Sequence, residues 1–185
     1  MLRTTRAYSG MVTAPHHLAA QAGLEVLRDG GNAIEAMIAA AATIAVVYPH
    51  MNGLGGDGFW LIGQPDEPVE AIQACGRSAA LASRDWYFEQ EHRTIPSRGA
   101  LAALTVAGAV SGWQAAYQSS QNRHGGRLPL TRLLEDAIRH AREGVAVTRS
   151  LHDNTAAKLG ELAGVPGFAE TYLSNGAPLA IAGRL

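Results

Sequence analysis

The stretch GGNAIEAMIAAAATIAVVYPHMNGLGGDGFWLI, residues 30–62, predicts a helix, then a glycine-rich loop, then a strand. Its glycines Gly53, Gly55 and Gly58 have the G-x-G-x-x-G spacing of a dinucleotide-binding loop. Such a loop follows a strand and opens a helix, so that the pyrophosphate lies on the helix N-terminus. Because the order is reversed here, we expect no dinucleotide. We expect the glycines instead to allow close backbone approach or positive φ angles.

The start of this stretch predicts a tight corner between two helices. The preceding residues, HHLAAQAGLEVLRDGG (16–31), have helical periodicity, and Gly30 and Gly31 are typical of a helix C-terminus. Asn32, with Glu35 three residues later, has the spacing of a capping box. The second helix, Asn32 to Val47, is apolar nearly all round, so we expect it to be buried on several sides.

The remaining elements are predicted from shorter patterns. A short strand is expected at Met11–Thr13 and a hairpin at Phe59–Gln64 and Val69–Ala74, joined by a turn rich in proline and acidic residues. Residues 100–110 are small and apolar. Further helices are expected at Gly112–Gln121, Pro129–Arg142 and Thr148–Leu162, with a helical turn at Phe168–Leu173.

The composition describes a near-neutral chain of 185 residues with a formal net charge of −1 and 47% hydrophobic residues. The charge balance gives no reason to expect nucleic acid or a membrane as a partner. The single cysteine, Cys75, excludes an internal disulfide and a cysteine-based zinc site. His16 and His17 are adjacent rather than four residues apart, so we expect no metal, and no other cofactor. The first residues lack the apolar segment of a secretory signal, and the apolar run Ala36–Val47 is too short to span a bilayer, so we expect a cytoplasmic protein.

Several stretches together resemble the gamma-glutamyltranspeptidase family of the Ntn-hydrolases. They are GGNAIEA, PHMNGLGGDGF, ACGRSA, LPLTRLLEDAIRHAREGVAVT and PGFAETYLSNGAPLAIAGRL, and the likeness extends over nearly the whole chain. The resemblance implies an α+β fold that is part of an αββα sandwich, with two stacked antiparallel sheets between helical layers. It also implies that residues 1–185 form a single, incomplete domain, the N-terminal portion of the large subunit.

The family resemblance also implies roles for particular residues. Family members process themselves, and the new N-terminal threonine of the small subunit is the nucleophile, activated by its own α-amine. No threonine of this chain has that context, so we expect no catalytic residue here and no activity from residues 1–185 alone. Arg77 corresponds to the arginine that binds the substrate carboxylate, although Ser78 stands where the family usually has an acidic residue. Gly55, Gly56 and Asp57 form a candidate active-site loop.

Two reactions and one non-enzymatic role follow as hypotheses. The resemblance implies a gamma-glutamyltransferase or glutathione hydrolase-like enzyme that acts on a small amide with a free carboxylate. The alternative is a cytoplasmic amidase like oxamate amidohydrolase, and cephalosporin-acylase-like chemistry is a third possibility. A truncated, non-catalytic remnant is the remaining hypothesis. Because half a sandwich cannot cover its own core, we expect an exposed apolar face and a partner, either the small (beta) subunit or the remaining C-terminal chain. A homo-oligomer stays open.

Overall fold

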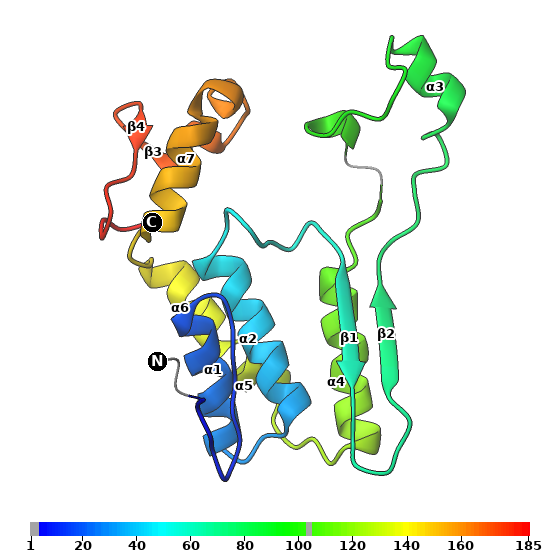
Figure 1. Ribbon diagram of the computed structural model, residues 1–185, viewed down its shortest axis with the longest axis vertical. Helices are drawn as coiled ribbons and strands as arrows, with labels where there is room; N and C mark the ends of the chain where they lie inside the picture. The colour runs from blue at the N-terminus through cyan, green and yellow to red at the C-terminus, as the bar shows by residue number, and fades with distance from the viewer. Residues whose placement is uncertain (1–3, 103–104) are drawn as a thin grey trace. The chain divides into compact units, whose positions relative to one another are not determined.

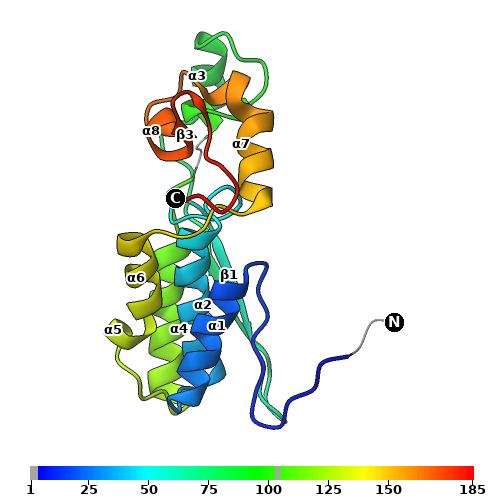
Figure 2. The same ribbon diagram turned by 90° about the vertical axis from the view of Figure 1, so that its left-hand side faces the viewer.

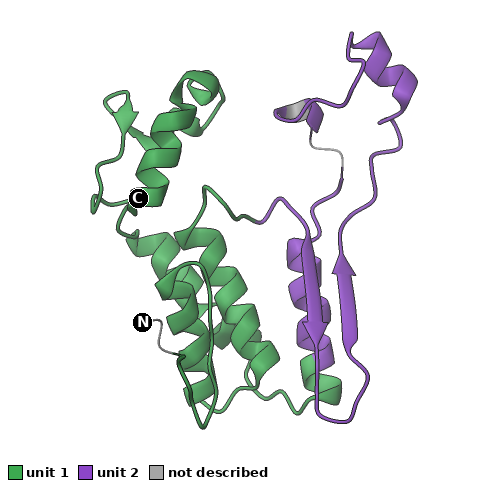
Figure 3. Cartoon of the chain, viewed as in Figure 1, with its two compact units in different colours: residues 1–53, 120–185 green, residues 54–119 purple. Residues whose placement is uncertain are grey.

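The computed structural model describes residues 4–102 and 105–185. The chain divides into two compact units, residues 1–53 with 120–185 and residues 54–119 (Figure 3). Helices and short antiparallel strand pairs confirm the expected α+β class, whereas the single domain remains a prediction. The elements, most of which are labelled in Figure 1, are α1 (His17–Arg28), α2 (Ala33–Val47), β1 (Gly58–Ile62), β2 (Glu70–Ala74), α3 (Arg84–Glu89), the 3₁₀ helix η1 (Ala100–Ala102), α4 (Ala109–Arg123), α5 (Leu130–Leu133), α6 (Glu135–Glu143), α7 (Arg149–Leu162), α8 (Phe168–Tyr172), β3 (Leu173–Ser174) and β4 (Ala177–Pro178).

Two glycines end α1 and turn the chain into α2. Gly30 has a φ of 87°, and its N–H donates to the carbonyl of Leu27 at 3.2 Å, while the N–H of Gly31 donates to that of Val26 at 2.9 Å. These are the two hydrogen bonds of a Schellman motif. A Cβ on Gly31 would lie 2.7 Å from a methyl carbon of Val26, so the position has no room for a side chain. The predicted corner is confirmed, and α1 and α2 lie side by side (Figure 2).

Small and medium-sized apolar side chains are buried on α1 and α2, the two helices that pack together. Ala19, Ala22 and Val26 of α1, and Ile38 and Ala39 of α2, are each at most 2% exposed. Alanine at a helix contact allows the two backbones to approach closely, because helix separation depends on side-chain size. Since α2 also contacts α5 and α6, its expected burial on several sides is confirmed.

A buried carboxylate ties the start of α2 to a distant loop. Asn32 and Glu35 form the predicted capping box, in which Glu35 accepts the N–H of Asn32 at 2.9 Å. The other carboxylate oxygen of Glu35 accepts the N–H groups of Arg127 and Leu128, at 2.8 and 2.9 Å, and the side-chain amide of Gln121 at 3.1 Å. Glu35 is 0% exposed. The local cap is therefore also a clamp that holds the chain after α4 against α2.

The helix expected at Pro129–Arg142 is interrupted once, which corrects the prediction. Leu134 has a ψ of −4°, which lies away from helical values and separates α5 from α6. The predicted ends are confirmed, because Pro129 precedes α5 and Gly144, with a φ of 78°, follows α6. The helix predicted from Thr148 is α7, in which the Thr148 hydroxyl accepts the N–H of Leu151 at 3.1 Å.

The predicted hairpin is confirmed in the second unit. β1 and β2 pair antiparallel, with Gly58 opposite Ala74 at one end. The face that carries Trp60 and Glu70 is half-buried against α4, where the hydroxyl of Ser119 donates to the Glu70 carboxylate at 2.8 Å. Figure 1 shows both strands beside α4.

The opposite face of the hairpin is apolar and open. Phe59 and Leu61 alternate with the half-buried positions of β1 and are 69% and 81% exposed. In the described part of the chain, this sheet contains only β1 and β2, so both of its edges are unpaired. The expected exposed apolar face is therefore present.

Two further expectations concern a strand near the N-terminus and the membrane. The strand expected at Met11–Thr13 is absent, because this segment pairs with no strand among the described residues; Val12 instead lies against α1, close to Gly23. None of the helices in residues 4–102 and 105–185 is both long and apolar enough to cross a bilayer. The cytoplasmic location remains a prediction.

Candidate carboxylate-binding site

The predicted site residues surround the end of the hairpin at which Gly58 pairs with Ala74. Arg77 follows β2 by three residues and is exposed. Its carbonyl accepts the N–H of Val106 at 3.1 Å, and Ser78 forms an isolated antiparallel bridge with Thr105. Segment 74–78 therefore runs directly against segment 105–109. We call this contact the glycine crossing, because Gly76 lies in the first segment and Gly108 in the second.

Gly76 and Gly108 make the glycine crossing possible. A Cβ on Gly76 would lie 1.9 Å from the carbonyl oxygen of Val106, and a Cβ on Gly108 would lie 2.1 Å from that of Ala74. Contacts this short do not occur for real Cβ atoms, so only glycine fits while the two backbones touch. Sequence reasoning missed both residues. The available signals were the position of Gly76 directly before Arg77 and the run of small residues at 100–110.

The role expected for the loop glycines is wrong within the described chain. No atom lies within 4 Å of a Cβ placed on Gly53, Gly55 or Gly56, and a Cβ on Gly58 would lie in ordinary contact with the Ala109 backbone, at 3.6 Å; none of these glycines has a positive φ. The loop is held instead by its backbone, because the carbonyl of Gly56 accepts the N–H groups of Gly108 and Ala109, both at 2.9 Å. Those N–H groups open α4, where a helix leaves its first donors without internal partners. The loop is thus fastened to the glycine crossing.

Two charged side chains of this site, those of Arg77 and Asp57, are exposed. Among residues 4–102 and 105–185, neither the Arg77 guanidinium nor the Asp57 carboxylate makes a hydrogen bond or an ion pair. The arrangement offers a planar cation on a backbone that is hydrogen-bonded on the Val106 side, which suits bidentate binding of a carboxylate. Cys75 is half-buried, and its sulfur accepts the side-chain amide of Gln73 at 3.0 Å.

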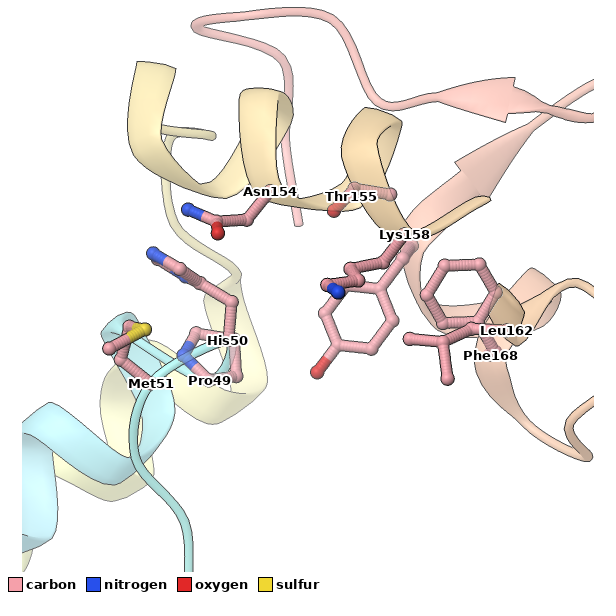
Figure 4. Close-up of a pocket in the computed structure, with 9 residues that line it drawn as sticks. Pro49, His50, Met51, Asn154, Thr155, Lys158, Leu162 and Phe168 are labelled. Carbon is pink, nitrogen blue, oxygen red and sulfur yellow. The ribbon is translucent and has the colours of Figure 1, made fainter. Parts of the chain in front are cut away.

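A cavity of about 400 Å³ lies in the first unit, and none of the predicted site residues lines it (Figure 4). His50 and Met51 line one side, and Lys158 and Phe168 the other. Burial lowers the pKa of His50, whose Nε2 lies 2.9 Å from the hydroxyl of Ser150, and burial raises the pKa of Tyr172. A second cavity, of about 430 Å³, lies within residues 82–95. In the described chain, no three histidine, cysteine or acidic side chains are grouped as a metal site.

Comparisons with known proteins show the family to which the chain is similar. The family model described as gamma-glutamyltranspeptidase matches residues 19–183. The oxamate amidohydrolase proenzyme of Klebsiella pneumoniae subsp. pneumoniae is 58% identical over 167 residues, which are 90% of this chain and 31% of the relative. The glutathione hydrolase-like YwrD proenzyme of Bacillus subtilis is 40% identical over 167 residues, 90% of this chain and 30% of the relative. The crystal structure of Helicobacter pylori gamma-glutamyltranspeptidase matches with a TM-score of 0.86 at 22% identity, covering 99% of this chain and 52% of that one.

The chain belongs to the gamma-glutamyltranspeptidase family. The structural likeness confirms the expected fold class, part of the Ntn-hydrolase αββα sandwich. The chain spans about a third of the length of the curated relatives reported above, 31% and 30%.

Proposed function

We propose that this chain provides the scaffold and the carboxylate-binding arginine of an amide hydrolase. The observation that carries the proposal is the exposed guanidinium of Arg77, which has no hydrogen-bond or ion-pair partner among the described residues. Arg77 lies three residues after β2, and its backbone carbonyl accepts the N–H of Val106 from a neighbouring segment. The bond-breaking group is a threonine on polypeptide outside residues 1–185, which form the N-terminal portion of a large subunit.

The substrate proposed first is a small amide whose carboxylate lies next to the scissile carbonyl, as in oxamate. The support is the 58% identity to an oxamate amidohydrolase proenzyme over 90% of this chain. A guanidinium that binds the carboxylate in a bidentate manner would fix the orientation of so small a molecule. The second candidate is a gamma-glutamyl amide, which is supported by the 40% identity to a glutathione hydrolase-like proenzyme.

A partner polypeptide is part of the proposal. Phe59 and Leu61 expose an apolar face, and both edges of the β1–β2 sheet are unpaired within the described residues. Exposed apolar faces and unpaired strand edges are usually covered in a finished protein. We assign this role to the small subunit, or to the remaining C-terminal chain before processing.

The test uses the full-length, processed protein and compares hydrolysis of oxamate with that of a gamma-glutamyl anilide. Replacing Arg77 with Ala should raise KM for the carboxylate-bearing substrate by about 10- to 100-fold, because hydrogen bonds to a charged group contribute about 1.5–3 kcal/mol. Arg77→Lys should recover part of the loss, since an ammonium keeps the charge without the planar fork. Arg84→Ala is the matched control, because Arg84 is exposed and lies over the Phe88 ring, 5.0 Å from its centroid. An unchanged KM in Arg77→Ala removes the carboxylate role.

A further inference from the structure

We infer that Gly76 and Gly108 are positioning residues that set the direction of the Arg77 side chain by allowing two backbones to cross in contact. The inference rests on the proposed role of Arg77 and extends it to residues that touch no substrate.

The first step is that the position of Arg77 depends on its backbone. Its guanidinium has no hydrogen-bond or ion-pair partner among the described residues, so no such interaction within them orients it. Two backbone ties hold the segment, the hydrogen bond from Val106 to the Arg77 carbonyl and the bridge between Ser78 and Thr105. A displacement of segment 105–109 would therefore move the base of the arginine.

The second step is that either glycine sets the distance between the segments. The would-be contacts of 1.9 Å at Gly76 and 2.1 Å at Gly108 are both with backbone carbonyl oxygens, which cannot rotate away as a flexible side chain can. An added methyl group must therefore separate the two segments by about an ångström or more. Misplacement on that scale can reduce kcat/KM by about 100-fold, and for a group that binds the substrate carboxylate we expect the loss in KM.

The third step concerns the loop that carries Asp57. The carbonyl of Gly56 accepts the N–H groups of Gly108 and Ala109, so the loop follows any shift of segment 105–109. Gly108 therefore couples two predicted site regions, the arginine and the loop. Gly76 meets this segment at Val106, the residue that donates to the Arg77 carbonyl, and within the described chain makes no hydrogen bond to the loop itself, which makes Gly76→Ala the more selective variant.

The experiment measures oxamate and oxamide with the full-length, processed enzyme. Oxamide replaces the carboxylate of oxamate with a neutral amide, so it does not need the guanidinium. Gly76→Ala should raise KM for oxamate by at least about 10-fold with kcat nearly unchanged, and should change KM for oxamide by less than about 2-fold. Gly63→Ala is the control, because nothing lies within 4 Å of a Cβ there and the residue has no positive φ.

A double-mutant cycle separates this inference from the proposed function. If Gly76 acts through Arg77, adding Gly76→Ala to Arg77→Ala should cause little further loss of kcat/KM for oxamate. Equal losses on oxamate and oxamide, or fully additive losses, would overturn the positioning role while leaving the arginine role intact. No effect of Arg77→Ala itself would instead overturn the proposed function.

A gentler variant keeps the inference testable if Gly76→Ala does not fold. Val106 is 68% exposed, so Val106→Gly removes no core side chain but loosens the segment that holds the Arg77 carbonyl. We expect KM for oxamate to rise by about 3- to 10-fold with the oxamide value unchanged. A Val106→Gly enzyme with the oxamate KM of the parent would contradict the inference.

Discussion

Two junctions of this molecule bring distant segments together by opposite means. At the start of α2, the Glu35 carboxylate collects N–H groups from Arg127 and Leu128, so a side chain holds the junction. At the glycine crossing, Gly76 and Gly108 remove side chains so that the backbones meet directly. The first junction is closed and buried within its unit, whereas the second adjoins a hairpin with an open apolar face. The difference suggests that the first junction supports the fold and the second supports a site.

The largest effect is expected when the side-chain junction is broken. Glu35→Ala leaves the backbone N–H groups of Asn32, Arg127 and Leu128 and the Gln121 amide without their acceptor. Because each unsatisfied buried donor costs about 1–3 kcal/mol, we expect the free energy of unfolding to fall by about 3–5 kcal/mol. Thermal melting of the full-length protein, followed by circular dichroism, measures the loss.

Two companion variants make this prediction specific. Glu35→Gln keeps one carbonyl oxygen for the Arg127 side and should lose less stability than Glu35→Ala. Glu25→Ala removes an exposed glutamate of α1 and should change stability by less than about 0.5 kcal/mol. A melting temperature for Glu35→Ala within the range of Glu25→Ala would show that the clamp contributes little.

A smaller effect is expected at the open face of the hairpin. Leu61 is 81% exposed in this chain, so Leu61→Asp would cost little if the face stayed in water. If the remaining polypeptide covers it, the substitution buries a charge and loses an apolar contact, and we expect about 2–4 kcal/mol of destabilisation in the full-length protein. Ile138→Asp on α6, at a position 43% exposed, is the control. Equal melting temperatures for the two variants would argue against a covering partner.

The sequence predicted one junction better than the other for a physical reason. A capping box is local, so Asn32 and Glu35 could be identified by their spacing of three residues. The hydrogen bond from the Arg127 N–H to Glu35 could not be identified in this way, because the two residues are 92 positions apart. The glycine crossing also joins distant segments, and glycines carry no periodicity that would pair Gly76 with Gly108.

Within the predicted site, Arg77 was predicted more accurately than the glycine loop near it. Arg77 was identified through the family resemblance, and its place after a strand was predicted correctly. The reason given for the loop glycines was wrong, since Gly55 and Gly56 are neither crowded nor left-handed in the described chain. The spacing of glycines in a sequence marks a position of interest. It does not tell whether a turn, a close backbone contact or a partner chain is the reason for the glycine.

The smallest effect is expected at the start of α1, where a histidine caps the helix. Nδ1 of His16 accepts the N–H of Leu18 at 3.3 Å, so the neutral ring carries its proton on Nε2. Protonation would remove this acceptor and place a cation at the positive end of the helix dipole. Burial lowers the pKa of His16, and the nearby charges of His17, His140 and His50 lower it further. His16 is 5% exposed.

The sign of the pH effect follows from this lowered pKa. Below about pH 6.5, the ordinary histidine value, the unfolded state binds a proton that folded His16 resists, so stability falls as pH decreases until the folded pKa is reached. Above that window the contribution is fully present. His16→Asn keeps a capping side chain without a titrating ring, so at pH 7.5 its stability should lie within about 1 kcal/mol of the parent, and its melting temperature should fall less between pH 7 and 5. His92→Asn, in the other unit, should keep the parent slope. If His16→Asn also keeps that slope, the cap does not titrate against folding, and the acid sensitivity belongs to His50 and His140, whose pKa values burial also lowers.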